Sequence, residues 1–220
     1  MFLAIAATEI EMTPLRQLIA GQEHRWLTLV GGVGPVETAL RLTRFLCTQG
    51  QPVTGVVNFG VAGAYLQPPG QQQANLLDIC LAEREILGDF GVCLPEGMHY
   101  LPEELTGRIS FQLDHELRRR AEEILEKHGI AVQVGTFVTV SGASGSRARG
   151  EDLRQRWQGL CENMEGAAVA RVCLDFALSL VEIRCISNMV EDRNPQSWRL
   201  AEACAKAAGT ALLLLQELER

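Results

Sequence analysis

The sequence predicts a single α/β domain over residues 1–220, and two features of the chain lead to that prediction. Short apolar runs, typical of buried strands, alternate with segments of helical periodicity, which is the pattern of α/β proteins. Glycine-rich or polar residues follow several of these runs, and in open α/β sheets ligands bind at the carboxyl ends of strands. No linker, repeat or low-complexity tract divides the chain, so we expect one ligand site within one domain.

The first sixty residues predict three strands and two helices. The apolar run at 2–7 suits a strand buried on both faces, and Thr8 can cap the helix that follows it. Pro14 fits that helix only near its first turn, because a proline further in would break the helix. In order, we expect strands at 2–7, 26–30 and 53–59, and helices at about 9–20 and 35–49.

Two glycine-rich stretches follow strands in this region, at 31–34 and 60–63. Glycine lets the backbone approach a ligand closely. The first stretch does not complete a G-x-G-x-x-G dinucleotide fingerprint, because Glu37 stands where the last glycine would be, and no Gly-Lys-Ser/Thr follows to make a P-loop. A ligand cradle and a plain tight turn are therefore both open readings of this stretch.

The rest of the chain continues the alternation of strands and helices. Residues 65–75 and 141–146 are rich in small or polar residues and predict loops, while 84–107 has little periodicity and is typical of a functional lid or an interface. We expect strands at 76–83, 132–140 and 178–186 with a short strand before Met164, and helices at 113–128, about 150–157, 165–176 and 198–218.

Charge and cysteine content restrict the classes of function. A net charge of −7 and a pI near 5.2 argue against a general nucleic-acid or anionic-membrane surface, so we expect neither partner. Seven cysteines without a C-x-x-C pair predict reduced core thiols and a cytoplasmic protein. The four histidines have no ligand spacing, so we expect no metal and no cofactor. The apolar start is too short for a signal peptide, and no run could span a bilayer.

The segment 161–168 (CENMEGAA) carries the most distinctive chemistry. Glu165 stands between Met164 and Gly166, ahead of small apolar residues that suit the start of a buried helix. The carboxylate can accept from two hydroxyls and the thioether is a soft apolar surface, a combination that suits a ribose. Taken alone, the pattern is more typical of an ordinary helix start, where the helix dipole favours a carboxylate.

Six short motifs in order resemble one family. The chain is similar to the purine nucleosidases of the nucleoside phosphorylase superfamily that act on methylthioadenosine and S-adenosylhomocysteine, and more narrowly to the futalosine hydrolases of menaquinone biosynthesis. The resemblance covers nearly the whole chain and implies a three-layer fold, with a twisted mixed sheet flanked by helices, that forms a homodimer or higher homo-oligomer. The motifs are Ala7-Thr8-Glu9-Ile10-Glu11, Gly32-Val33-Gly34, Asn58-Phe59-Gly60-Val61-Ala62-Gly63, Val140-Ser141-Gly142, Asn163-Met164-Glu165-Gly166 and Arg184-Cys185-Ile186-Ser187-Asn188.

The resemblance also implies a role for individual residues. Glu11 matches the carboxylate that activates the attacking water, and Met164 and Glu165 match the ribose-binding pair. Asn188 stands where the adenine-specific enzymes carry the Asp that protonates the purine at N7. Further substrate contacts are expected at Val61, Gly63, Ser141 and Arg184.

Asn188 bears on the choice of base. An amide donates to a 6-oxo group and accepts from a protonated N7, so it favours hypoxanthine or guanine over adenine. Futalosine carries hypoxanthine. The expected reaction is therefore hydrolysis of the N-glycosidic bond of futalosine, with release of hypoxanthine and dehypoxanthine futalosine.

Three alternatives are weaker. A 6-oxopurine nucleoside phosphorylase would have to bind phosphate beside Glu9 and Glu11, with no Arg in residues 1–15. Asn188 disfavours a methylthioadenosine/S-adenosylhomocysteine-type nucleosidase, and the presence of both Glu11 and Glu165 disfavours a nucleoside-binding protein without catalysis. The residues that bind the 5′ benzoate-bearing substituent stay open. The candidates are Arg147, Arg149 and Arg193 for the carboxylate, with His99, Tyr100 or Trp198 against the ring.

Overall fold

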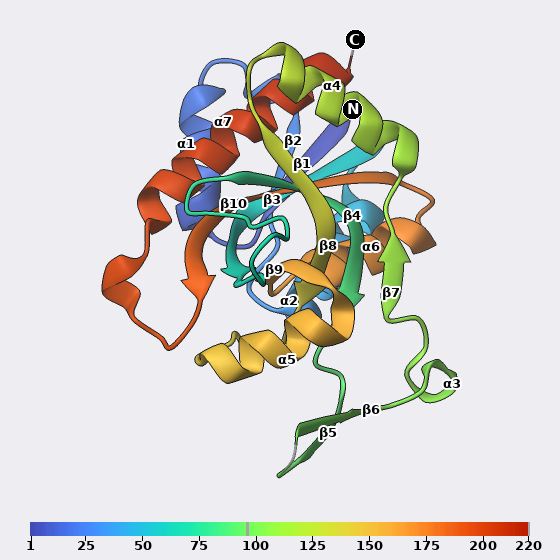
Figure 1. Ribbon diagram of the computed structural model, residues 1–220. Helices are drawn as coiled ribbons and strands as arrows, with labels where there is room; N and C mark the ends of the chain where they lie inside the picture. The colour runs from blue at the N-terminus through green and yellow to red at the C-terminus, as the bar shows by residue number, and fades with distance from the viewer. Residues whose placement is uncertain (96, 220) are drawn as a thin grey trace.

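The computed structural model describes residues 1–95 and 97–219, and its centre is a mixed β-sheet with helices on both sides (Figure 1). The prediction of a twisted mixed sheet flanked by helices is confirmed. The strands are β1 (Phe2–Ala6), β2 (Leu27–Val30), β3 (Gly55–Tyr65), β4 (Ile79–Leu87), β5 (Gly91–Leu94), β6 (Gly97–Tyr100), β7 (Ser110–Gln112), β8 (Val132–Thr139), β9 (Gly159–Asn163) and β10 (Ser179–Val190). The helices are α1 (Glu9–Leu18), α2 (Pro35–Thr48), α3 (Glu103–Thr106), α4 (His115–Lys127), α5 (Arg147–Trp157), α6 (Gly166–Asp175) and α7 (Leu200–Leu218).

The main sheet has the strand order β10-β4-β8-β9-β3-β1-β2, with β7 beside β4. β10 also pairs with β3, so the pairings β3–β9–β8–β4–β10–β3 form a closed circuit. β1 and β10 run parallel to β3, whereas β9 runs antiparallel to it. β3 is therefore the strand on which the closed circuit and the β1–β2 extension meet.

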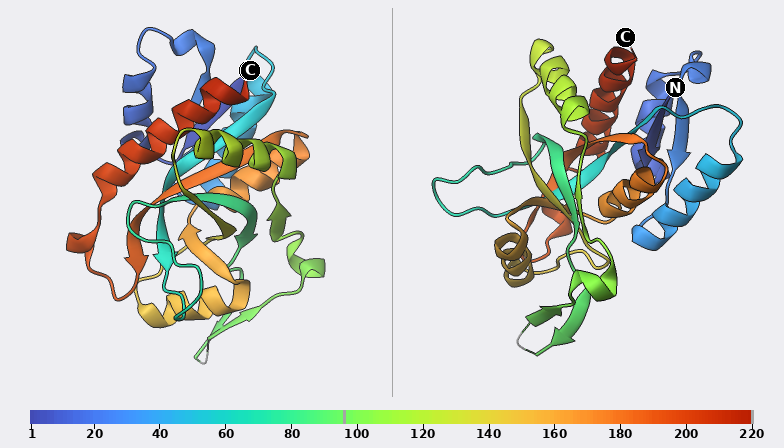
Figure 2. Two further views of the ribbon diagram at one scale, coloured as in Figure 1. Left: turned by 45° about the horizontal axis from the view of Figure 1, so that its top comes forward. Right: turned by 90° about the vertical axis from the view of Figure 1, so that its right-hand side faces the viewer.

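Helices cover both faces of this sheet (Figure 2), and their apolar side chains are buried against it. α1, α4 and α7 share one core with β1, β3 and β10, while α2 and α6 share a second core with the opposite face. A side chain such as Leu214 of α7, which is fully buried, stabilises the fold by about 1.5–3 kcal/mol. α5 packs on a third, smaller cluster that includes Tyr65 and Val190. The two cores hold the ends of β3 and β10 in place from both sides.

Two strands are longer than the sequence predicts. β3 was expected to stop at residue 59 and β10 at residue 186, but they continue in parallel register to Tyr65 and Val190, with a bulge between Ile186 and Asn188. The glycines after residue 59 lie within the strand and allow close approach: a Cβ at Gly60 would lie 2.5 Å from Oε1 of Glu11. A polar side chain thus reaches the sheet where glycine leaves room for it.

The region 84–107 is more regular than expected. β5 and β6 pair as an antiparallel hairpin that projects from the main body, and α3 follows it (Figure 1). The cysteine prediction holds for five of the seven residues, because Cys47 and Cys93 are exposed; all seven are free. Within the described part of the chain, no helix is both long enough and apolar enough to cross a membrane.

Candidate active site

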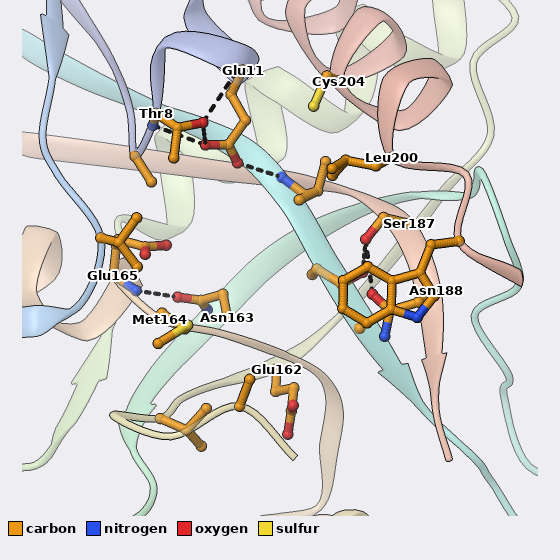
Figure 3. Close-up of a pocket in the computed structure, with 18 of the residues that line it drawn as sticks. Thr8, Glu11, Glu162, Asn163, Met164, Glu165, Ser187, Asn188, Leu200 and Cys204 are labelled. Carbon is orange, nitrogen blue, oxygen red and sulfur yellow. Dashed lines mark hydrogen bonds between the residues drawn. The ribbon is translucent and has the colours of Figure 1, made fainter. Parts of the chain in front are cut away.

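A cavity of about 260 Å³ lies between the start of α1, the later halves of β3 and β10, and the start of α6 (Figure 3). Segments from residue 7 to residue 204 contribute to its wall, so the fold brings together side chains that are far apart in the sequence. Six of the residues predicted for the site line the cavity: Glu11, Val61, Gly63, Met164, Glu165 and Asn188. The two others, Ser141 and Arg184, do not line it.

Glu11 is held at the first turn of α1 by a capping box. Thr8 is the N-cap: its Oγ1 accepts from the Glu11 N–H, and its own N–H donates to Oε2 of Glu11 at 3.0 Å. Oγ1 of Thr8 also lies 2.8 Å from Oε2, and the Val61 N–H of β3 donates to Oε1 at 3.1 Å. Glu11 is only 5% exposed. Because Oε1 has one donor, it keeps a lone pair that can accept from a water in the cavity.

The glycine turn between β2 and α2 serves the site. Gly34 has a φ of +86°, which an L side chain rarely adopts, and its N–H donates to Oε1 of Glu165 at 3.2 Å. Val33 of the same turn lines the cavity. The turn therefore positions a backbone donor on the carboxylate that the sequence assigns to ribose binding.

Glu165 occupies the N-cap position of α6 and is 6% exposed. Burial raises the pKa of Glu165, while the charge of Arg184 and the Gly34 N–H act in the opposite direction. Oε2 lies 3.4 Å from Nη1 of Arg184, so each carboxylate oxygen has one partner and a lone pair left over. Such a carboxylate can accept hydrogen bonds from two hydroxyls, while the half-buried Met164 beside it supplies an apolar surface.

The start of α6 is fixed by two side chains from neighbouring strands. Oδ1 of Asn163 accepts the Glu165 and Gly166 N–H groups at 2.8 and 2.7 Å, and Oγ1 of Thr139 accepts the Ala167 N–H at 2.7 Å. These bonds satisfy backbone donors that a helix N-terminus leaves open. The position of Glu165 is thereby set from β8 and β9, not by its own helix alone.

Arg184 lies behind the cavity, where it is 1% exposed. Its Nε donates to Oε1 of Glu182 at 2.9 Å, and its Nη1 faces both Glu165 and, at 3.4 Å, the carbonyl of Val61. Burial alone would lower the pKa of Arg184, but Glu182, Glu165 and two further carboxylates raise it above the usual value. Arg184 is therefore placed to orient Glu165 from behind, not to line the cavity as a substrate contact.

A second buried acid, Glu85 of β4, completes this network. Burial first, and then the charge of Glu182, raise the pKa of Glu85 well above its usual value, which favours the protonated form. Thr139 Oγ1 and Asn163 Nδ2 contact its two oxygens at 2.8 and 2.5 Å. Gly166 is required beside it, because a Cβ there would lie 2.0 Å from Oε1 of Glu85. Sequence reasoning did not identify Glu85 or Glu182.

Asn188 follows the bulge of β10 and is half-buried at the cavity wall. Oδ1 accepts from Oγ of Ser187 at 2.9 Å, and Nδ2 donates to the Met189 carbonyl at 3.2 Å. An amide has two donors and two acceptor lone pairs, so one of each stays available to a ligand. Asn188 can therefore donate and accept at the same time.

Glu162 is a wall residue that sequence reasoning missed. It is 6% exposed, and Ser144 donates to both of its oxygens, through N–H at 2.8 Å and Oγ at 2.7 Å. The local sequence gives no signal for it, because Glu162 reaches the cavity through the pairing of β9 with β3. The loop that follows β8 enters the cavity through Ala143 and Ser144. Ser141 is exposed instead, and its N–H is bound by Asp89.

The candidates for the 5′ substituent separate clearly. Arg193 and Trp198 line the cavity, with the guanidinium carbon 4.7 Å from the centre of the indole ring. Arg149 is bound to Asp89 and to the Gly142 carbonyl. The remaining candidates, Arg147, His99 and Tyr100, lie outside the cavity wall. Over residues 1–95 and 97–219, no three His, Cys, Asp or Glu side chains are grouped as metal ligands would be.

Comparison with known proteins agrees with this geometry. The Phosphorylase superfamily matches residues 13–218. A futalosine hydrolase of Thermus thermophilus is 33% identical over 192 residues, which cover 84% of this chain and 79% of that protein. A 5′-methylthioadenosine/S-adenosylhomocysteine nucleosidase of Marinomonas sp. is 27% identical over 193 residues, with 86% and 78% covered.

The fold is also shared with solved structures. A Helicobacter pylori 5′-methylthioadenosine/S-adenosylhomocysteine nucleosidase, solved with butyl-thio-DADMe-Immucillin-A, has a TM-score of 0.85 to this chain at 21% identity. The match covers 98% of this chain and 97% of that one. The chain therefore belongs to the phosphorylase superfamily, where its relatives include futalosine hydrolases and 5′-methylthioadenosine/S-adenosylhomocysteine nucleosidases.

Proposed function

We propose that this protein is a nucleoside N-glycosyl hydrolase that cleaves futalosine, releasing hypoxanthine and dehypoxanthine futalosine in menaquinone biosynthesis. The observation that carries the proposal is the amide of Asn188, which stands in one cavity with the carboxylates of Glu11 and Glu165. The 33% identity to a futalosine hydrolase supports the same substrate.

Glu11 is the proposed general base. Water attacks C1′ of the ribose while the C1′–N9 bond breaks, and the water proton passes to Oε1 of Glu11, which has a free lone pair. The electron pair of the broken bond moves into the purine, N7 takes up a proton from solvent water, and neutral hypoxanthine leaves. General base catalysis of this kind contributes about 10²–10⁴ in rate.

Glu165 and Met164 are the proposed ribose contacts. The two oxygens of Glu165 accept from the ribose hydroxyls, and charge-assisted bonds of this kind are worth about 1.5–3 kcal/mol each. The reaction passes through an oxocarbenium-like sugar, as in glycoside hydrolysis, so a nearby negative charge favours the transition state. Burial alone would favour the neutral acid, and Arg184 opposes that tendency from behind.

Asn188 is the proposed reader of the leaving base. Its free N–H faces the 6-oxo group and its free Oδ1 lone pair accepts from a protonated N7. A 6-aminopurine would set its amino group against the amide donor and leave buried polar groups unpaired. This contact pattern favours futalosine over methylthioadenosine, the substrate class named for the other relatives.

Arg193 and Trp198 are the proposed contacts of the 5′ substituent. Among the described residues that line the cavity, Arg193 is the single cation, and its guanidinium stacks on Trp198 without an ion pair to any described carboxylate. A benzoate needs a cation for its carboxylate and a flat apolar surface for its ring, and this stacked pair supplies both.

Purine release, measured by chromatography, tests the proposal with futalosine, aminodeoxyfutalosine, inosine and methylthioadenosine, each with and without phosphate. We expect hypoxanthine from futalosine, independent of phosphate. Asn188→Asp should shift preference toward the 6-amino substrates. Phosphate-dependent turnover would instead indicate a phosphorylase, and adenine release by the unaltered protein would indicate the methylthioadenosine-type reaction.

A further inference from the structure

Glu162 is a buried carboxylate in the cavity wall to which the proposed reaction gives no role. Its carboxylate is held in place by Ser144, whose N–H and Oγ donate to its two oxygens. A carboxylate has about four lone-pair sites, so these two bonds do not use its capacity to accept. Burying a charge at a ligand cavity is costly unless further partners satisfy it, which suggests that a ligand supplies a donor.

The pairing of three strands places Glu162 opposite Asn188. Glu162 of β9 pairs with Gly63 of β3, and Gly63 pairs on its other side with Asn188 of β10. Directly paired residues share a face, and two strand spacings put the Cα atoms of Glu162 and Asn188 roughly 9–10 Å apart.

Gly63 leaves the space between them open. A Cβ at Gly63 would lie 3.0 Å from Nδ2 of Asn188 and 3.0 Å from Cγ2 of Val190, so any side chain would crowd the amide. Gly63 lines the cavity together with both polar residues. A flat ring can therefore lie over Gly63 with one edge toward the amide and another toward the carboxylate.

We propose that Glu162 recognises the N1–H of a 6-oxopurine whose O6 and N7 face Asn188. The inference rests on the proposed function of this site and makes its choice of base more specific. A 6-oxopurine carries a hydrogen on N1, whereas N1 of a 6-aminopurine is an acceptor that a carboxylate repels. Glu162 and Asn188 thus apply the same selection from two sides of the ring, and a site with two such contacts discriminates more strongly than either alone.

Ser144 presents two donors to Glu162, which shows that both of its oxygens act as acceptors. Burial raises the pKa of Glu162 above its usual value, and the Oγ and N–H of Ser144, together with Tyr65, offset that rise only in part. Burial and the charge of Glu162 raise the pKa of Tyr65, a member of the third core cluster, well above the usual value, so Tyr65 keeps its proton.

Binding of free bases tests the inference without the 5′ substituent. The dissociation constants of hypoxanthine and 1-methylhypoxanthine, measured by calorimetry, are compared in the unaltered protein and in Glu162→Gln. Gln keeps the size of the side chain, and Ser144 Oγ can reverse its role to accept from the new amide. Glu123→Gln, which removes an exposed carboxylate of α4, is the matched control for loss of one charge.

The unaltered protein should bind hypoxanthine about 10- to 100-fold more tightly than the 1-methyl base, and Glu162→Gln should lose most of that difference. Equal weakening of both bases in Glu162→Gln, or no weakening, would overturn the inference. If Glu162→Gln does not fold, the unaltered protein alone decides the question. Equal affinity for hypoxanthine and 1-methylhypoxanthine would then exclude an N1–H contact. Failure of the proposed function shows separately, as absence of hypoxanthine release from futalosine.

Discussion

Replacing Glu11 by Gln tests the proposed base and has two separable effects. The carboxylate accepts from the backbone N–H groups of Thr8 and Val61 through different oxygens. Gln has one carbonyl, so its NH₂ group must face one of these two donors and leave it unpaired. An unpaired buried donor costs about 1–3 kcal/mol, and 1 kcal/mol shifts Tm by roughly 2–4 °C in a chain of this size. We therefore expect Tm to fall by roughly 2–12 °C.

The rate should fall much further than this stability loss explains. Without the base, single-turnover cleavage of futalosine should slow by about 10²–10⁴, while affinity for futalosine stays near that of the unaltered protein. Asp114→Ala is a matched control: it removes the N-cap of α4, outside the cavity, and costs about 0.5–2 kcal/mol. Its turnover per folded molecule should be unchanged at a temperature where both variants stay folded.

Two results would refute the reasoning. If Glu11→Gln cleaves futalosine within about threefold of the unaltered rate, the loss lies below the range for a general base, and another group must activate the water. If affinity and rate fall together by similar factors, Glu11 contributes to binding or to the shape of the cavity rather than to the chemical step.

Three further changes address neighbouring parts of the site. Gly60→Ala puts a Cβ within 2.5 Å of Oε1 of Glu11, so we expect the carboxylate to be displaced and kcat to fall at least tenfold while hypoxanthine binding, measured by calorimetry, is retained. Burial raises the pKa of Glu165 above its usual value, so kcat/KM should fall when Glu165 becomes protonated at low pH. Arg184→Lys has one ammonium group in place of the guanidinium that contacts both Glu182 and Glu165, so it should move this acid limb of the pH profile to higher pH. If the acid limb does not move in Arg184→Lys, Arg184 does not control the ionisation of Glu165. Arg193→Gln should raise KM for futalosine about tenfold and leave inosine unchanged, and an equal change for both would exclude Arg193 as the 5′ contact.

Features set by local sequence were predictable. Thr8 and Glu11 are three residues apart at the start of a helix, and the capping box between them needs no information from the rest of the chain. The alternation of apolar runs and periodic segments likewise predicted the order of the major strands and helices, although β3 and β10 extend beyond their expected ends. In these cases the physical cause, a cap or a hydrophobic face, acts over one or two turns.

Features set by strand register were not predictable. Glu85 of β4 and Asn163 of β9 are 78 positions apart in the sequence. They meet because β8 pairs with β4 on one side and with β9 on the other. The glycines after residue 59 suggested that the strand ends there, because glycine weakens a strand on its own. In the fold, the pairing with β10 continues through them, and the missing side chains leave room for Glu11 and Asn188.

The negative charges in the cavity wall favour water over phosphate as the nucleophile. Glu11, Glu162 and Glu165 all line it, whereas the buried cation Arg184 is already bound to Glu182 and Glu165. At about 4 Å and an effective dielectric constant near 20, two like charges repel by about 4 kcal/mol, a large penalty for phosphate beside Glu11. The same negative charges stabilise a cationic sugar and do not repel water. Arg193 does not alter this balance if it binds the 5′ carboxylate, because the substrate then neutralises the single cation among the described wall residues.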